Sequence, residues 1–509
     1  MTNPLFDALL GGHDGRADPL LHLADGGTLS YADFLDLSAR LANALAAAGL
    51  APGDRLAAQV AKSPEALALY AACIRAGVVF LPLNPAYTED ELSYFVEDSG
   101  ARMLVGDPGR GPGLRSVAEA AGAAVETLDG AGGGTLTEKA SAQPAAHEPV
   151  PRAQDDLAAI LYTSGTTGRS KGAMLTQRNL LSNALTLAEA WRFSDGDVLL
   201  HALPIFHTHG LFVATNVALA TGGSMIFLPA FDLDAIARVL PRATAMMGVP
   251  TFYTRMLGDV RIDREATAHM RLFVSGSAPL LAETHAAFER RTGHRILERY
   301  GMTETNMIAS NPYDGERRPG TVGHPLPGVE VRITDAETAR EVPTGEIGQI
   351  EVRGPNVFAG YWRMPDKTAA ELREDGFFVT GDLGRLDADG YLSIVGRDKD
   401  LIISGGYNVY PKEIEVVLDE QPGVLESAVV GVPHPDFGET PVGVLVAEGE
   451  GPDLERIDAA VRDKLARYKH PRRLVVVDAL PRNAMGKVQK KALREEYADL
   501  FAPAEARAR

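Results

Sequence analysis

Apolar residues in the first hundred positions follow two periodicities in turn. The stretches 55–60 and 78–81 are strand-like, and the second is a continuous apolar run typical of a buried strand. Around them, leucines recur at helical spacing behind Ser30, which together with Asp33 resembles a capping box. Strands that alternate with helices in this way predict parallel βαβ units with helices on both faces of a sheet. Further predicted strands are 102–105, 157–161, 199–203, 224–228 and 272–275, and the predicted helices are 30–48, 65–76 and 89–98.

The pattern changes at two points farther along the chain. Beyond residue 329, short strands separated by Gly and Asp turns predict a small β-rich subdomain. Beyond residue 396, helices and strands alternate again over roughly 110 residues, the size of a separate α+β domain. The predicted fold class is therefore α/β: a large N-terminal domain (1–396) of stacked mixed or parallel sheets with flanking helices and a β subdomain near 329–396, followed by a small α+β C-terminal domain (397–509). The later strands are predicted at 331–334, 346–353, 378–380, 391–395, 426–432 and 473–478, the later helices at 412–419 and 454–465, and surface loops at 107–114 and 129–150.

Composition narrows the classes of function. The chain has 509 residues, 45% hydrophobic and 23% charged, which is normal for a globular protein with a large core. Its net charge of −18 argues against a nucleic-acid binder, and any site for an anionic substrate must gather positive charge locally. A single cysteine, Cys73, excludes an internal disulfide and a thiolate metal cluster. The N-terminus lacks the basic start of a signal peptide and the most apolar stretch, 66–83, is interrupted, so we expect a cytoplasmic protein that does not enter a membrane.

One loop carries phosphate-binding chemistry. Glycines let a backbone approach a ligand closely, and successive N–H groups in such a turn attract an anion. The stretch 162–172 leaves the predicted strand 157–161 with three glycines, several hydroxyls and Lys171, which predicts a polyphosphate cradle. Its spacing is not that of the Walker A loop. A flexible linker, the alternative interpretation, would need neither Lys171 nor the strand. The cradle residues are Thr163, Ser164, Gly165, Thr166, Thr167, Gly168 and Lys171.

Five stretches in order along nearly the whole chain resemble the adenylate-forming superfamily of acyl-CoA synthetases, luciferases and peptide-synthetase adenylation domains. The first is the loop 162–172, and the others are Tyr300–Glu304, Thr380–Asp382, Gly396–Asp400 and Pro481–Lys487. This resemblance implies ATP and coenzyme A as substrates, Mg²⁺ as the ion, and a C-terminal domain that rotates between two poses.

The resemblance also implies residue roles. Tyr300 would stack on adenine, Thr303 would contact the α-phosphate, and Asp382 with Arg397 would hold the ribose. Glu304 would ligate Mg²⁺, which prefers carboxylate and phosphate oxygens, and we add Thr167 as a second candidate ligand. Lys487 would bridge the substrate carboxylate and the α-phosphate during adenylation, where a cation stabilises the developing charge. Each of these residues alone reads as a turn or surface residue, and the functional interpretation depends on the whole set.

Two further implications concern the C-terminal domain. Lys399 matches the hinge position, where a few residues at the end of an element absorb a rotation. Ser404, Gly405 and Gly406 would line the path of the pantetheine arm in the second pose. Acylation of Lys487 by a lysine acetyltransferase would remove its charge.

The acid is predicted from polar residues near the superfamily pocket. A fatty acid would favour an apolar wall, whereas Arg255 and Arg299 suit a short acid with a second carboxylate, because an arginine fork pairs bidentately with such a group. The stretches 203–210, 299–306 and 404–413 closely resemble malonyl-CoA synthetases. We therefore predict malonate, and methylmalonate as well, with Ser277, His207 and His209 assisting and Met302 limiting the pocket.

Three alternatives stay open at this point. The first is an acyl-CoA synthetase for acetate, a medium-chain acid or an aryl acid. The second is a stand-alone amino-acid adenylating enzyme, although 206–210 lacks the aspartate that such enzymes carry for the amine. The third is a nucleotide-binding regulator that retains the fold without catalysis.

Overall fold

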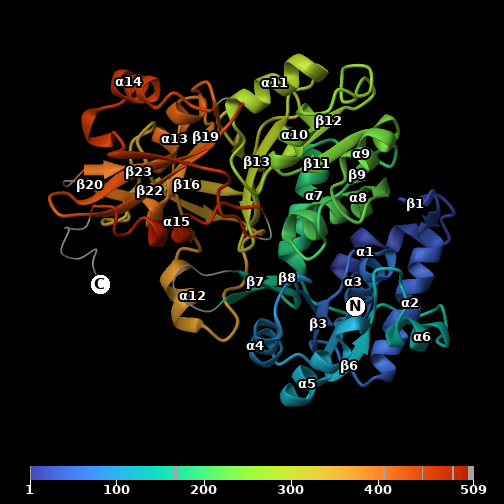
Figure 1. The fold of residues 1–509 in the computed structure, drawn as a ribbon. Helices are drawn as coiled ribbons and strands as arrows, with labels where there is room; N and C mark the ends of the chain where they lie inside the picture. The colour runs from blue at the N-terminus through green and yellow to red at the C-terminus, as the bar shows by residue number, and fades with distance from the viewer. Residues whose placement is uncertain (1, 164–169, 405–406, 450, 484–485, 502–509) are drawn as a thin grey trace.

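The computed structural model describes residues 2–163, 170–404, 407–449, 451–483 and 486–501. These residues form four β-sheets with helices around them (Figure 1). The predicted α/β class, with a sheet-rich N-terminal part and a smaller C-terminal part, is confirmed.

A six-stranded sheet lies near the N-terminus. Its five parallel strands are separated by helices, and an antiparallel strand, β8, closes one edge beside β7. The loop predicted to bind phosphate is therefore the connection of a β7–β8 hairpin, and Lys171 is the first residue of β8. In sheet order the strands are β6 (Ala124–Thr127), β5 (Met103–Gly106), β3 (Arg55–Gln59), β4 (Val79–Pro82), β7 (Leu157–Thr163) and β8 (Lys171–Thr176).

The helices of this region largely match the predictions. Three of them were predicted within one or two residues of their bounds: α2 (Tyr31–Ala47), α3 (Pro64–Ala76) and α4 (Glu89–Ser99). The prediction of loops at 107–114 and 129–150 is wrong in part, because α5 (Gly111–Ala121) and α6 (Thr135–Ser141) fall there. Leu114 of α5 packs over Gly106 of β5, so tertiary burial overrides a Gly- and Pro-rich composition.

A nine-stranded sheet forms the second layer. Strands β13 to β1 are parallel, with antiparallel strands at both edges. One apolar core joins the two large sheets through α3, α7 (Gln177–Ala190) and α8 (Asn216–Thr221). The strand order is β15 (His324–Pro325), β14 (Asn306–Ser310), β13 (Leu297–Met302), β12 (Leu272–Ser275), β11 (Ala245–Gly248), β9 (Val198–His201), β10 (Ser224–Phe227), β1 (Pro19–Leu23) and β2 (Thr28–Ser30), and nearby helices are α1 (Pro4–Leu9), α9 (Leu233–Val239), α10 (Pro250–Leu257) and α11 (Ala282–Thr292).

The predicted β-rich subdomain corresponds to a four-stranded antiparallel sheet. Its strands are β16 (Glu330–Thr334), β17 (Gly348–Arg353), β18 (Phe378–Leu386) and β19 (Leu392–Arg397). A short helix, α12 (Pro365–Glu371), lies between β17 and β18 in the chain. The buried face of the four-stranded sheet contacts Tyr300, so this sheet adjoins β13 of the nine-stranded sheet.

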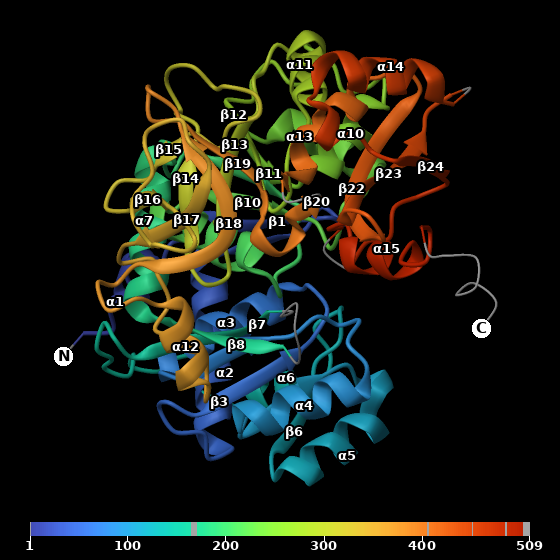
Figure 2. The ribbon, with the colours of Figure 1, turned by 90° about the vertical axis from the view of Figure 1, so that its left-hand side faces the viewer.

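The C-terminal part has a sheet of its own, built on a long β22–β23 hairpin. The predicted helices and strands are present, and β23 had not been predicted. In both views this part lies beside α11 and away from α5 (Figures 1 and 2). A boundary at 397–399, within or next to the turn Asp398–Asp400, stays a prediction. Its elements are β20 (Ile402–Ser404), β21 (Tyr407–Val409), α13 (Pro411–Asp419), β22 (Val424–His434), β23 (Gly438–Ala447), α14 (Leu454–Lys464), β24 (Arg473–Val477) and α15 (Lys490–Glu496).

None of the helices in the described part of the chain has the length and apolar character that a bilayer crossing requires.

Candidate active site

The candidate site lies where parallel strands of the nine-stranded sheet end. The carboxyl ends of such strands share one edge of a sheet and form a crevice for ligands. His207 and His209 follow β9, Ser277 follows β12, and Arg299 lies on β13. The order β13-β12-β11-β9 therefore brings together residues that are up to 92 positions apart in the sequence, from His207 to Arg299.

Arg299 is the most informative residue of this crevice. Its side chain is 3% exposed, and its Nε and Nη2 atoms have no hydrogen-bond partner in the described structure. Gly276 leaves the space for it, because a Cβ atom at that position would overlap the guanidinium. A buried cation without a counter-charge is costly, so this arrangement fits an incoming anion.

His209 and Ser277 lie at the same edge of the sheet, in the segments that follow β9 and β12. The Ser277 hydroxyl lies 3.3 Å from Nδ1 of His209. Ser277 has a φ of +72°, which is unusual for a residue other than glycine and is a strain found at functional sites. The Nε2 atom of His209 and the hydroxyls of Thr208 and Ser275 are buried without partners, so they are polar groups that a ligand could satisfy.

Burial keeps both histidines neutral, and nearby cations act in the same direction. Burial, with Lys487 and Arg299 nearby, lowers the pKa of His207 to about 3. Burial and Arg299 lower the pKa of His209 in the same direction. Burial also lowers the pKa of Arg299 to about 9, which leaves its guanidinium protonated at neutral pH. Arg299 therefore carries positive charge in this crevice, and the imidazoles act as neutral hydrogen-bonding groups.

Arg255 has a different environment from Arg299. Its side chain is exposed on α10, with the guanidinium 5.7 Å from the centre of the Phe231 ring, while Tyr253 and Met256 are the buried residues of that helix. Its predicted contact with a distal carboxylate stays a prediction. Met302, half-buried at the end of β13, remains near the crevice.

The predicted adenine and ribose residues lie beside one another. Tyr300 donates a short hydrogen bond to Oδ2 of Asp382, and Nε of Arg397 lies 2.6 Å from Oδ1 of the same carboxylate. Asp382 and Arg397 face each other across β18 and β19. Tyr300 belongs to strand β13, and Asp382 lies inside β18, because the strand predicted at 378–380 continues to Leu386.

Glu304 is the residue that fits the expected Mg²⁺. It is 6% exposed, and Oε1 lies 3.1 Å from the Tyr361 hydroxyl and 3.5 Å from that of Thr163. No group of three or more His, Cys, Asp or Glu side chains among the described residues could hold a metal by itself. One carboxylate suits an ion that completes its shell with substrate phosphates and water. Burial raises the pKa of Glu304, while Lys171 and Arg397 act in the opposite direction.

The remaining phosphate-binding predictions are only partly described. Lys171 lies 3.5 Å from Oε1 of Glu371 and 4.2 Å from the centre of the Tyr361 ring. Thr303 is half-buried in the turn after β13. The predictions for Ser164, Gly165, Thr166, Thr167 and Gly168, together with Gly405 and Gly406, lie outside the described residues.

Lys487 reaches this site from the C-terminal part. Its side chain is exposed to solvent, and partial desolvation with Arg397 lowers its pKa while Asp382 and Glu304 raise it. Lys399 lies in the turn Asp398–Asp400, where its carbonyl accepts a hydrogen bond from Arg494. Ser404 is buried at the end of β20.

Sequence reasoning missed Gly276, Tyr361 and Glu371. Gly276 matters only because Arg299 folds over it from the neighbouring strand. Tyr361 and Glu371 reach Glu304 and Lys171 from a segment almost 200 residues beyond the phosphate loop. The sequence carries no local sign of these contacts.

Comparison with known proteins gives the family. The chain matches the model of AMP-binding enzymes over residues 15–362 and that of the AMP-binding enzyme C-terminal domain over residues 413–487. It belongs to the family of AMP-binding enzymes.

Particular relatives narrow the comparison. A malonate–CoA ligase of Arabidopsis thaliana is 38% identical over 453 residues, which cover 82% of this chain and 74% of the relative. A sulfoacetate–CoA ligase of Cupriavidus necator is 36% identical and covers 92% of this chain and 93% of its own. The ATP-bound crystal structure of MatB from Rhodopseudomonas palustris is 56% identical, covers 98% of this chain and 100% of its own, and has a TM-score of 0.96. The TM-score with the apo structure of the same protein is 0.87.

Proposed function

We propose that this protein is an AMP-forming acid–CoA ligase that converts malonate, and also methylmalonate, to the CoA thioester. The observation that carries the choice of acid is the buried guanidinium of Arg299, with two nitrogens that lack a partner beside neutral His209 and Ser277. A distal carboxylate would satisfy these groups with charge-assisted hydrogen bonds. The relative that acts on malonate supports the same acid.

In the first half-reaction the proximal carboxylate of malonate attacks the α-phosphorus of ATP. An O–P bond forms, the bond to the β-phosphate oxygen breaks, and pyrophosphate leaves. We assign to Lys487 the stabilisation of the charge that develops between carboxylate and α-phosphate, with His207 as a neutral neighbour within its electrostatic reach. We assign the nucleotide to Tyr300, Asp382 and Arg397, the α-phosphate to Thr303, and the departing phosphates to Lys171 and the loop 163–168.

Glu304 would hold Mg²⁺ together with phosphate oxygens, and the ion would supply charge neutralisation for the leaving pyrophosphate.

In the second half-reaction the sulfur of coenzyme A attacks the acyl carbon. A C–S bond forms, the bond to AMP breaks, and the thiol proton passes to solvent. We assign the pantetheine path to the hairpin that begins at Ser404 and the required rotation to Lys399. We also propose that the protein works in the cytoplasm, and that a lysine acetyltransferase acting on Lys487 would stop adenylation by removing its charge.

The test is an acid panel with the purified protein, ATP, Mg²⁺ and CoA, in which the thioester is identified by mass. The panel contains malonate, methylmalonate, sulfoacetate, acetate, a fatty acid and an aryl acid. Malonyl-CoA as the main product is the expected result. Preference for acetate, a fatty acid or an aryl acid would overturn the assignment of Arg299, and preference for sulfoacetate would keep a distal anion but change its identity.

A further inference from the structure

Four side chains, those of Lys171, Glu304, Tyr361 and Glu371, form a group between β8 and α12, and the proposed mechanism uses only the first two. Tyr361 and Glu371 contact Glu304 and Lys171, which we have assigned to Mg²⁺ and the departing phosphates. Tyr361 is placed by its own backbone, whose N–H donates to Thr368 of α12 at 2.9 Å, and by a bridge to Ala173 of β8.

Both the hydroxyl and the ring face of Tyr361 make contacts with charged groups. Its hydroxyl lies 2.7 Å from Oε2 of Glu371 and 3.1 Å from Oε1 of Glu304. Its ring face lies 4.2 Å below the ammonium of Lys171, a distance at which a cation is attracted to an aromatic ring. One residue therefore fixes the separation between a carboxylate and an ammonium that must act on the same polyphosphate.

Glu371 completes the group from the end of α12. Its Oε1 atom lies 3.5 Å from Nζ of Lys171 and 2.6 Å from Nζ of Lys367. The longer distance leaves the Lys171 pair weak, and both side chains retain some exposure, 17% for Lys171 and 22% for Glu371. A phosphate oxygen can replace Glu371 at Lys171, because Lys367 remains as a partner for the carboxylate.

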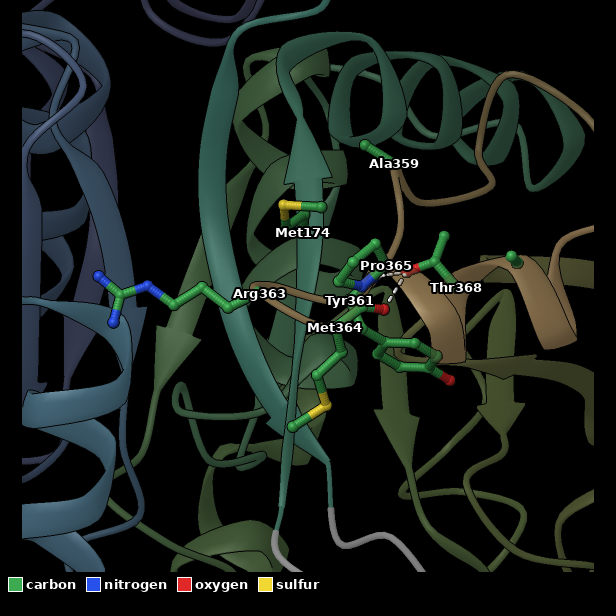
Figure 3. Close-up of a pocket in the computed structure, with 8 residues that line it drawn as sticks. Met174, Ala359, Tyr361, Arg363, Met364, Pro365 and Thr368 are labelled. Carbon is green, nitrogen blue, oxygen red and sulfur yellow. Dashed lines mark hydrogen bonds between the residues drawn. The ribbon is translucent and has the colours of Figure 1, made fainter.

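The tyrosine itself cannot move easily. It is 2% exposed, and the Phe358 ring packs against it at 4.8 Å between centroids. Tyr361 also lines an open pocket of about 430 Å³, together with Met174, Ala359, Met364, Pro365 and Thr368. Figure 3 shows the Tyr361 ring turned away from Met174, so the hydroxyl does not face that methionine.

We propose that Tyr361 and Glu371 are positioning residues of the nucleotide site: Tyr361 aligns Glu304 for the metal, and Glu371 holds Lys171 until phosphate takes its place. The inference rests on the proposed function, because it assumes that Glu304 and Lys171 act on ATP. It assigns no contact with substrate to either positioning residue.

The test is calorimetry of ATP binding, with Mg²⁺ and with EDTA, on the full-length protein and three variants. Tyr361→Phe keeps the ring beneath Lys171 and removes the hydroxyl, so it should reduce affinity for ATP with Mg²⁺ about tenfold and leave binding in EDTA within about twofold. Glu371→Gln keeps an oxygen for Tyr361 and removes the competing charge, so affinity for ATP in EDTA should rise severalfold. Tyr70→Phe removes another buried hydroxyl, bonded to Asn216 at 3.2 Å, and should change neither affinity.

Tyr361→Phe is expected to lower the affinity for ATP and Glu371→Gln to raise it, and this difference separates positioning from a merely structural role. If both Tyr361→Phe and Glu371→Gln weaken ATP equally with and without Mg²⁺, the proposal is overturned and the residues belong to the core. An unchanged affinity in both variants overturns it as well. If Tyr361→Phe does not fold, Glu371→Gln alone decides, since weaker binding in EDTA contradicts the proposal. The protein without substitutions separates the proposed function from the positioning roles. If it fails to form malonyl-CoA, the proposed function is rejected, while calorimetry of ATP binding still tests the roles of Tyr361 and Glu371.

Discussion

Two arginines predicted from the same reasoning have different environments in the structure. Arg299 is buried with two nitrogens that lack partners, whereas Arg255 is exposed on α10. The free energy available from pairing with a substrate carboxylate is larger at the buried site, because screening by water weakens an exposed pair. Specificity for a second carboxylate should therefore depend on Arg299.

We expect Arg299→Ala to raise the KM for malonate about 100-fold, because the substitution removes two hydrogen bonds from a charged donor to the substrate. The KM for ATP should stay within about twofold, because we assign the nucleotide to Tyr300, Asp382 and Arg397. Steady-state kinetics with each substrate varied in turn measures both values.

Arg255→Ala is the matched control, since it removes the same group from the surface and should change the malonate KM by less than twofold. An equal effect of the two substitutions would show that Arg255 turns into the site when malonate binds.

At the scale of elements, the turn after β9 positions the histidines of the site. Residues His209–Thr215 form a π-helical turn, a geometry often found at functional sites. The carbonyl of Gly210 accepts hydrogen bonds from His201 at 2.8 Å and from Thr215 at 3.0 Å. Nδ1 of His201 lies 2.9 Å from the ammonium of the half-buried Lys62, so the turn is tied to the loop after β3 in the six-stranded sheet.

Gly210→Ala should disturb this turn, because the new Cβ would overlap the carbonyl group of Pro204. We expect a loss of about 1–3 kcal/mol in unfolding free energy and a higher malonate KM, since overpacking displaces the backbone that carries His207 and His209. Thermal unfolding and the same kinetic assay measure the two effects.

Gly12→Ala serves as control, because nothing lies within 4 Å of a Cβ at that position. A Gly210→Ala protein with unchanged stability and unchanged KM would show that the turn accommodates a methyl group and does not fix the histidines.

At the scale of the whole molecule, the arrangement of the two parts decides which half-reaction the site can perform. Lys487 comes within electrostatic reach of Glu304, Asp382 and Arg397, which lie in the N-terminal part. The higher TM-score with an ATP-bound relative than with its apo form agrees with an arrangement for adenylation.

Lys487→Ala should therefore slow malonyl-adenylate formation about 100-fold or more, because a cation at the reacting centre is lost. Conversion of supplied malonyl-adenylate to malonyl-CoA should change little. Pyrophosphate release and thioester formation are measured separately. Lys491→Ala, at a side chain that is 75% exposed, is the control. An equal loss of rate in both half-reactions would reject the role of Lys487.

Lys399→Pro should impair the second half-reaction instead of the first. Proline fixes φ at its own position and restricts the preceding residue, so rotation at the turn Asp398–Asp400 should become slower. We expect adenylation to persist while thioester formation from supplied adenylate falls about tenfold or more. Lys399→Ala removes the side chain but leaves the backbone free, and should retain both halves. A Lys399→Pro protein with a normal second half-reaction would place the hinge elsewhere.

The sequence by itself determined the elements and much of the chemistry. Strands such as 272–275 and helices such as 65–76 follow from periodicity and caps, because these are local properties of the chain. The motif residues Tyr300, Asp382 and Arg397 could be selected because their types and order match a known family, and the structure places them side by side.

Only the tertiary structure decided which of these residues are buried and what they contact. The exposure of Arg255, the unpaired nitrogens of Arg299 and the contacts of Tyr361 depend on segments that meet from distant parts of the sequence. Helix α5 formed in a stretch read as a loop for the same reason, since Leu114 is stabilised by packing over β5. Burial and long-range pairing are properties of the packed chain, and the local order of residues does not contain them.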